Sequence, residues 1–201
     1  MAGKLSGELA QYDSAIQYLT RAGQAFVALK DSTGLGDSFY ETGIVYSVRA
    51  KYKESIVAEQ KAFVIYQKTQ NHNGATQALL SLGNSNLKLK KYPDAKQFYT
   101  QALERSQRNS AFEQMVEAYD GLANVYESQK DFRKAITSVR LMQGAYDSIT
   151  NRDHKRKLDE LEEKYSKQLE EKDQELVTAE AQRQQARTIV CSGSSNATTF
   201  D

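Results

Sequence analysis

The chain has 201 residues, and its 27 lysine and arginine side chains are balanced by 26 aspartate and glutamate side chains, which gives a formal net charge of +1. That balance argues against a nucleic-acid binder held by phosphate contacts, because such proteins usually carry a basic excess on one face. Cys191 is the only cysteine, which excludes an intrachain disulfide and a multi-cysteine zinc site, and the single proline with few β-branched runs predicts an all-α chain.

The first predicted element is a helix over about residues 12–30, preceded by a short stub from Met1 to about Glu8. Gly3 falls where the middle of a preceding helix would lie, so the first hairpin is predicted to be incomplete. The apolar stripe of the helix would then be poorly covered on one side, and we expect either a truncated first helix or a partner to account for this. The stripe consists of Tyr12, Ile16, Leu19, Phe26 and Leu29.

Three complete helical hairpins are predicted to follow, because apolar residues recur three and four positions apart along each segment. The joints carry turn and cap residues, among them Gly34, Gly36 and Gly74, and glycine is expected to supply a positive φ where a helix stops. Pro93 suits the first turn of a new helix. The predicted pairs are 37–49 with 52–68, 75–89 with 92–107, and 112–129 with 131–149.

The hairpins repeat at a constant interval of 40 residues, as the numbers 12, 52, 92 and 132 of one aromatic column show. Residues of similar type recur at that interval in four columns. Such a chain is an array of repeats, each of which buries its apolar face mainly against its neighbours. The columns are Gly3, Gly43, Gly83 and Ala123; Tyr12, Tyr52, Tyr92 and Phe132; Ala15, Ser55, Ala95 and Ala135; and Ala22, Ala62, Ala102 and Met142.

These columns resemble the tetratricopeptide repeat, and the resemblance covers about residues 1–150. It implies a right-handed α-α superhelix of helical hairpins. The interval of 40 resembles the long-helix subgroup, and repeats followed by a charged helix resemble the sensor part of bacterial tetratricopeptide signalling proteins. Glu59, Val139 and Met142 depart from the second-helix consensus. The matching residues are Phe39, Thr42, Gly43, Tyr46, Tyr52, Ser55 and Ala62; Leu79, Leu82, Gly83, Tyr92, Ala95, Tyr99 and Ala102; and Tyr119, Leu122, Ala123, Tyr126, Phe132 and Ala135.

A long charged helix is predicted over residues 151–188, where Glu162 and Glu163 replace the Leu-Gly of the repeat and the array is expected to stop. Its apolar residues step by three and four, with an 11-residue relation from Leu158 to Leu169 that suits a straight or right-handed coiled coil. We expect its first half to cap the last hairpin. Residues 152–187 are expected either to form a homodimer or to remain a solvated helix held by Glu–Lys pairs. Residues 189–201, rich in Ser, Thr and Asn, are predicted to be disordered.

No catalytic site is predicted, because the sequence offers no converging acid, base and nucleophile. His72 lies in a turn and His154 in a basic run, and a phosphoacceptor role for His154 is disfavoured because the proline-containing motif that usually follows is absent. The glycine pair Gly34 and Gly36 is too short a motif for a phosphate-binding loop. The chain is therefore expected to be no enzyme and to use no metal or cofactor.

The resemblance also implies a groove, because the first helices of a tetratricopeptide array line its concave side. Asn84 and Asn124 share one position in successive repeats, where their amides would either bind an extended peptide backbone or satisfy neighbouring side chains. Lys88 is the only basic groove residue against five acidic ones, which favours a neutral or basic ligand segment. The implied positions are Asp37, Tyr40, Glu41 and Ile44; Gln77, Leu80, Ser81, Asn84 and Lys88; and Glu117, Asp120, Asn124 and Glu127.

We therefore expect a non-enzymatic module that binds a peptide or a helix of a partner protein in this groove. The alternative is a truncated sensory region of a bacterial histidine kinase or transcriptional regulator, with the charged helix as a signalling stalk. In that case residues 186–190 would be the start of a membrane segment. As written, the chain has no signal peptide and no apolar run of 18 residues, so it is expected to be cytoplasmic.

Overall fold

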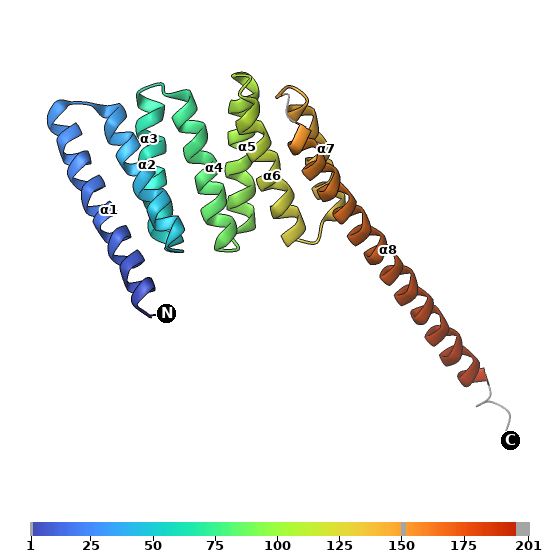
Figure 1. The fold of residues 1–201 in the computed structure, drawn as a ribbon. Helices are drawn as coiled ribbons and strands as arrows, with labels where there is room; N and C mark the ends of the chain where they lie inside the picture. Colours follow the sequence, from blue (N-terminus) through green and yellow to red (C-terminus); the bar gives the residue numbers. More distant parts are fainter. Residues whose placement is uncertain (1, 150–151, 196–201) are drawn as a thin grey trace.

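The computed structural model describes residues 2–149 and 152–195, and it places side chains for residues 11–149 and 156–185. All regular structure in these ranges is helical. The first seven helices stand side by side in a row, and the last one leaves the row as a long projection (Figure 1). The helices are α1 (Ala2–Leu29), α2 (Ser32–Val48), α3 (Tyr52–Lys68), α4 (His72–Lys88), α5 (Tyr92–Arg108), α6 (Phe112–Ser128), α7 (Phe132–Tyr146) and α8 (Arg152–Ser195).

Short turns of the same conformation separate the helices from α1 to α7. In the turn after α2, Ala50 N–H donates to the Ser47 carbonyl and Lys51 N–H donates to the Tyr46 carbonyl, each at 2.9 Å. These two bonds form a Schellman motif, which satisfies the last carbonyls of a helix. Its central residue has a positive φ at every joint, and that residue is Lys30, Ala50, Gln70, Lys90, Ser110 or Lys130.

The expectation that glycines would supply the positive φ is wrong, since no glycine in the described residues has one. Gly34 and Gly74 instead lie in the first turns of α2 and α4, and Gly36 lies just after the first turn of α2, where space is short. A Cβ on Gly36 would lie 3.0 Å from the ring of Tyr66, and one on Gly74 would lie 2.9 Å from the same ring. Glycine is therefore needed here for close packing rather than for backbone conformation.

Helix α2 begins five residues earlier than predicted, because Asp31 caps it. The Asp31 carboxylate accepts a 2.9 Å hydrogen bond from Gly34 N–H, and Asn71 accepts the same bond from Gly74 N–H at the start of α4. Both side chains satisfy a backbone donor that the first turn of a helix leaves free. Both glycine-containing segments are thus helix starts rather than joints.

The repeating columns form the interfaces between helices. Ser55, Ala95 and Ala135 are fully buried, and so are Ala62 and Ala102. Tyr52, Tyr92 and Phe132 are the first residues of α3, α5 and α7, so they occupy equivalent places in successive hairpins. The 40-residue interval is confirmed as the period of an all-α array of stacked hairpins.

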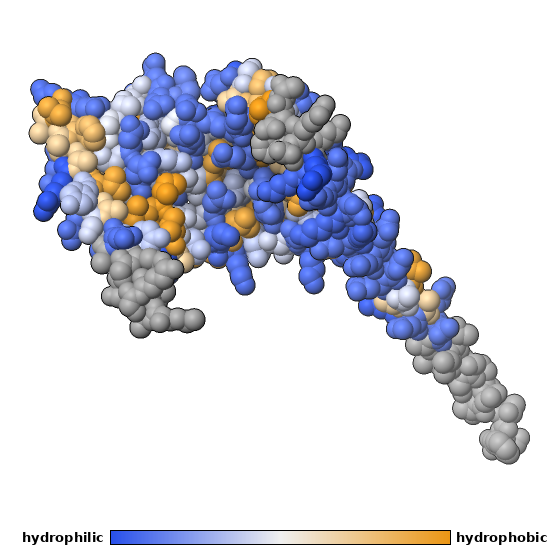
Figure 2. All heavy atoms as spheres, viewed as in Figure 1, coloured by the Kyte–Doolittle hydropathy of each residue, from blue (hydrophilic) through white to orange (hydrophobic). Residues whose placement is uncertain are grey.

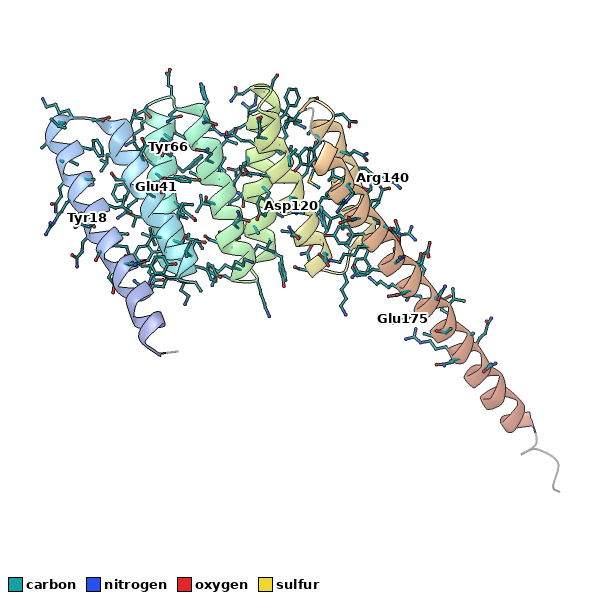
Figure 3. All side chains as sticks on the ribbon, viewed as in Figure 1. Tyr18, Glu41, Tyr66, Asp120, Arg140 and Glu175 are labelled. Atoms are coloured by element: carbon teal, nitrogen blue, oxygen red, sulfur yellow. The ribbon has the colours of Figure 1, made fainter. Side chains whose placement is uncertain are left out.

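The N-terminal element differs from the prediction, since α1 is one continuous helix rather than a stub followed by a helix. Residues 8–11 are Glu-Leu-Ala-Gln, all good helix formers, so nothing in the sequence stops the helix there. The apolar stripe that was expected to be poorly covered is only partly open, since Leu29 is 74% exposed whereas Tyr12, Ile16, Leu19 and Phe26 are half-buried. The outer face of α1 is open. Tyr18 is 69% exposed, whereas Ala58 and Ser138, at the same position of α3 and α7, are each 5% exposed (Figure 3).

The charged helix α8 continues the array, which was expected to end before it. It begins 40 residues after α6, at Arg152 against Phe112, and it packs on α7. Leu158 and Tyr165 are buried in that contact, while Glu162 pairs with Arg140 of α7 at 2.7 Å. The first half of α8 therefore lies where the first helix of a fifth repeat would lie, and the predicted capping of the last hairpin is seen.

The second half of α8 extends beyond the array. The helix runs to Ser195, so residues 189–195 are helical where disorder was predicted, and residues 196–201 lie outside the described residues. The side chains of His154 and Cys191 also lie outside them. Leu176 and Val177 are 54% and 66% exposed and form an apolar spot among hydrophilic residues of the projecting part (Figure 2). In the part of the chain that the structure describes, no helix combines the length and apolar character that crossing a bilayer requires.

Candidate functional site

The predicted groove residues all lie on α2, α4 and α6, the first helices of the three hairpins. Within the array, these first helices lie closer to one another than the second helices α3, α5 and α7 do. In a curved array, the set of helices that lie closer together is on the inside of the curve. The first helices therefore form the concave side. Ser81 of α4 lies close enough to the Tyr40 hydroxyl of α2 to oppose the rise that burial causes in the Tyr40 pKa, so side chains of neighbouring repeats meet across this surface.

A cavity of about 310 Å³ opens at the C-terminal end of the concave side. Four predicted groove residues line it: Leu80 and Asn84 of α4, and Glu117 and Asp120 of α6. The prediction missed the other lining residues, which come largely from α7 and α8. They are Val116, Met142, Tyr146, Lys157, Leu158 and Leu161. The signal that could have identified the α8 residues is the 40-residue interval itself, which places a first helix at residue 152.

The polar wall of the cavity carries two carboxylates. Glu117 and Asp120 lie one turn apart on α6, and burial raises the pKa of both. The charge of Asp120 raises the pKa of Glu117 further. Lys157 of α8 and a 3.0 Å hydrogen bond from Asn124 act against the rise at Asp120. This end of the groove is therefore acidic and only partly neutralised.

Several other predicted residues already bond within the chain. Asp37 accepts a 2.6 Å hydrogen bond from the Tyr66 hydroxyl. Asn84 accepts one of 2.7 Å from the Tyr99 hydroxyl. Glu127 bonds Lys164 and Tyr165 of α8, at 2.6 and 2.9 Å. Asn84 and Asn124 thus each use one amide atom on a neighbouring side chain.

The remaining predicted residues lie along the concave side without lining the cavity. Glu41, Gln77 and Lys88 are exposed, and Ile44 is half-buried. The structure therefore brings only four of the predicted positions together in one cavity. Among the described residues, no group of three His, Cys, Asp or Glu side chains is placed to hold a metal ion.

Comparison with known proteins identifies the repeat and the fold. Residues 76–109 match the tetratricopeptide repeat family model. No curated protein matches the chain. The fold is similar to that of RapI in its apo form, with a TM-score of 0.71 and 15% sequence identity over 96% of this chain and 69% of RapI.

A second solved structure is the Rap conjugation gene regulator of the plasmid pLS20 in complex with the Phr* peptide. It matches with a TM-score of 0.57 and 17% identity, over 84% of this chain and 52% of the regulator. The chain thus contains a tetratricopeptide repeat and has the superhelical fold of tetratricopeptide-type helical repeat proteins.

Proposed function

We propose that the chain is a non-enzymatic binding module whose concave side, formed by α2, α4 and α6, holds a peptide or helical segment of a protein partner. The observation that carries the proposal is the cavity at the end of this surface, where four groove residues converge beside α8. A concave site with apolar walls and a few polar groups is the usual form of a ligand site. The similar Rap regulator was solved with a peptide, Phr*, which supports a ligand of this class.

The acidic residues of the surface favour a neutral or basic ligand segment. Glu41 lies on this surface at α2, and Glu117 and Asp120 line the cavity, where Lys157 is the one lining cation. An acidic segment would place like charges together in a partly buried site, which disfavours binding.

The test is selection of linear peptides from an unbiased display library on the full chain, followed by affinity measurement. We expect the substitutions Glu41→Arg and Gln77→Arg, made together, to weaken binding of the selected basic or neutral peptides by about tenfold or more. Gln97→Arg with Glu104→Arg is the matched control, because it makes the same changes at exposed positions of α5, a second helix. Equal loss in both variants, or selection of acidic peptides, would contradict the proposal.

A second candidate function is the sensory part of a larger signalling protein, with α8 as its stalk. This reading is favoured because α8 both lines the cavity, through Lys157, Leu158 and Leu161, and continues beyond the array with Leu176 exposed. Because α8 contacts the last hairpin as far as Lys172 and Asp173, which meet Lys130 and Arg133, only the part beyond Asp173 is free to pair with a second copy.

Sedimentation tests this pairing. We expect the full chain to dimerise reversibly and Leu176→Glu to shift it to monomer, because a charge would enter the apolar seam. Gln174→Glu adds the same charge on the same helix at another exposed position and is expected to leave the dimer intact. A chain that stays monomeric at every concentration would remove the homodimer from consideration.

A further inference from the structure

We propose that the cavity between α4, α6, α7 and α8 is an anchoring subsite for a cationic nitrogen carried on an apolar body. Two parts of a peptide have this chemistry: a free N-terminal ammonium on an apolar residue, and the side chain of lysine or arginine. The inference rests on the proposed function and names the group that the ligand would place at this end of the groove.

The size and the apolar wall of the cavity fit one residue of a ligand. Its volume of about 310 Å³ is at the low end of the range for small-molecule sites, about 300–1,000 Å³. A whole helix is too large for it, whereas a single side chain can fill it. The apolar lining residues are Leu80, Val116, Met142, Leu158 and Leu161.

The charges of the cavity favour a cation. Glu117 and Asp120 supply two carboxylates from one face of α6, while Lys157 supplies one ammonium from α8. Glu117 makes no ion pair with any described residue. The site is therefore net negative when both carboxyls are ionised, and a bound cation would pair with two carboxylates that face a single ammonium. Both residues keep an exposed surface, and partial desolvation raises the pKa of both carboxyls.

Other acidic residues of the groove fit a cation less well. Asp37 is engaged by Tyr66, and Glu127 is engaged by Lys164 and Tyr165. Neither residue lines this cavity. The subsite is therefore specific to the end of the groove that α8 closes.

Methionine methyl NMR on the full chain tests the proposal, because the chain has only three methionines and Met142 lines the cavity. Met115 lies on α6 outside the cavity lining and serves as an internal reference. The probes are leucine amide, Nα-acetyl-lysine amide, Nα-acetyl-leucine amide and Nα-acetyl-glutamate amide. We expect saturable shifts of the Met142 signal with one or both cationic probes and none with the neutral or acidic probe.

The two cationic probes distinguish the two possible sources of the cationic nitrogen in a peptide. A response to leucine amide indicates an N-terminal ammonium, and a response to Nα-acetyl-lysine amide indicates a basic side chain. Glu117→Gln with Asp120→Asn is expected to weaken the response by about tenfold or more. Glu54→Gln with Glu104→Gln, at exposed positions of α3 and α5, is the control of equal charge and should leave it unchanged.

A Met142 signal that all four probes shift equally, or that none shifts, would overturn the inference, as would an undiminished response in the Glu117 and Asp120 variant. Selected peptides that still bind the groove in those cases would leave the proposed function standing. If the Met142 response and the binding of selected peptides were both absent, the groove itself would be rejected as a binding site.

Discussion

Between about pH 5 and about pH 8 the protein is expected to lose about 2–3 kcal/mol of unfolding free energy, and Glu59→Gln is expected to remove most of that loss. Glu59 is 1% exposed on α3. Its Oε1 accepts hydrogen bonds from Ser55 at 2.9 Å and from Ser85 of α4 at 3.2 Å. Its Oε2 has no hydrogen-bond partner among the described residues. Burial raises the pKa of this carboxyl to about 7, although the two serines oppose the rise.

The direction of the pH effect follows from the raised pKa. The folded protein holds the Glu59 proton more tightly than the unfolded chain, whose carboxyl titrates near 4.5. As the pH rises above that value, the unfolded chain gains stability by releasing a proton that the folded protein retains. Stability therefore falls as the pH rises, and the loss is complete once the pH passes the folded pKa.

Urea unfolding at several pH values measures the effect as a difference between the wild-type chain and Glu59→Gln. The amide is neutral at every pH and can still bond Ser55 and Ser85, so we expect the variant to be the more stable protein at about pH 8 and similar to wild type at about pH 5. Glu104→Gln, at an exposed position of α5, should show little such dependence. A wild-type minus variant difference that is flat with pH would mean that Glu59 ionises normally in the fold.

The array could be predicted from the sequence because the same columns are buried in every hairpin. Ala62 and Ala102 have no exposed surface, so selection for small size at that position leaves a visible period. At Gly83 the small residue of its column leaves room for a side chain of the next helix, since a Cβ there would lie 2.6 Å from the Tyr99 ring. The helix starts were less predictable, because a cap such as Asp31 acts through one hydrogen bond and leaves no periodic signal.

The sequence could predict which helices form the groove, but it could not predict the cavity at the end of the groove. Residues on α4 and α6 follow from the repeat, whereas the walls from α7 and α8 depend on where α8 docks. Glu162 and Glu163 suggested the end of the array, since an inner helix needs apolar residues there. A terminal helix has only one neighbouring hairpin, so only the face that bears Leu158 and Tyr165 has to remain apolar.

Gly121→Ala is expected to destabilise the fold by about 3 kcal/mol, at the upper end of the usual cost of overpacking. The Tyr99 ring of α5 is 1% exposed and lies against the backbones of two helices, at Gly83 of α4 and Gly121 of α6. A Cβ on Gly121 would overlap the Tyr99 ring. The ring cannot easily move away, because its hydroxyl donates a 2.7 Å hydrogen bond to Asn84 and Gly83 blocks its other side.

Gly144→Ala is the matched control, since Gly144 also lies within a helix, α7, and a Cβ there would meet nothing within 4 Å. Alanine is the better helix former, so this substitution is expected to stabilise the protein by about 0.5–1 kcal/mol. The same change of residue should therefore have opposite signs at the two positions. Thermal and urea unfolding of the two variants would show this directly.

A double-mutant cycle identifies the cause of the loss at Gly121. Tyr99→Leu alone is expected to cost about 2–4 kcal/mol, because it removes a buried ring and its hydrogen bond. If Gly121→Ala destabilises by overlap with that ring, then the methyl group added at 121 should be tolerated once the ring is gone. The double variant should accordingly be more stable than the sum of the two losses by about 1–3 kcal/mol. Additive losses would place the strain elsewhere in α6, and the close packing of Tyr99 between two first helices would not be what fixes the spacing of α4 and α6.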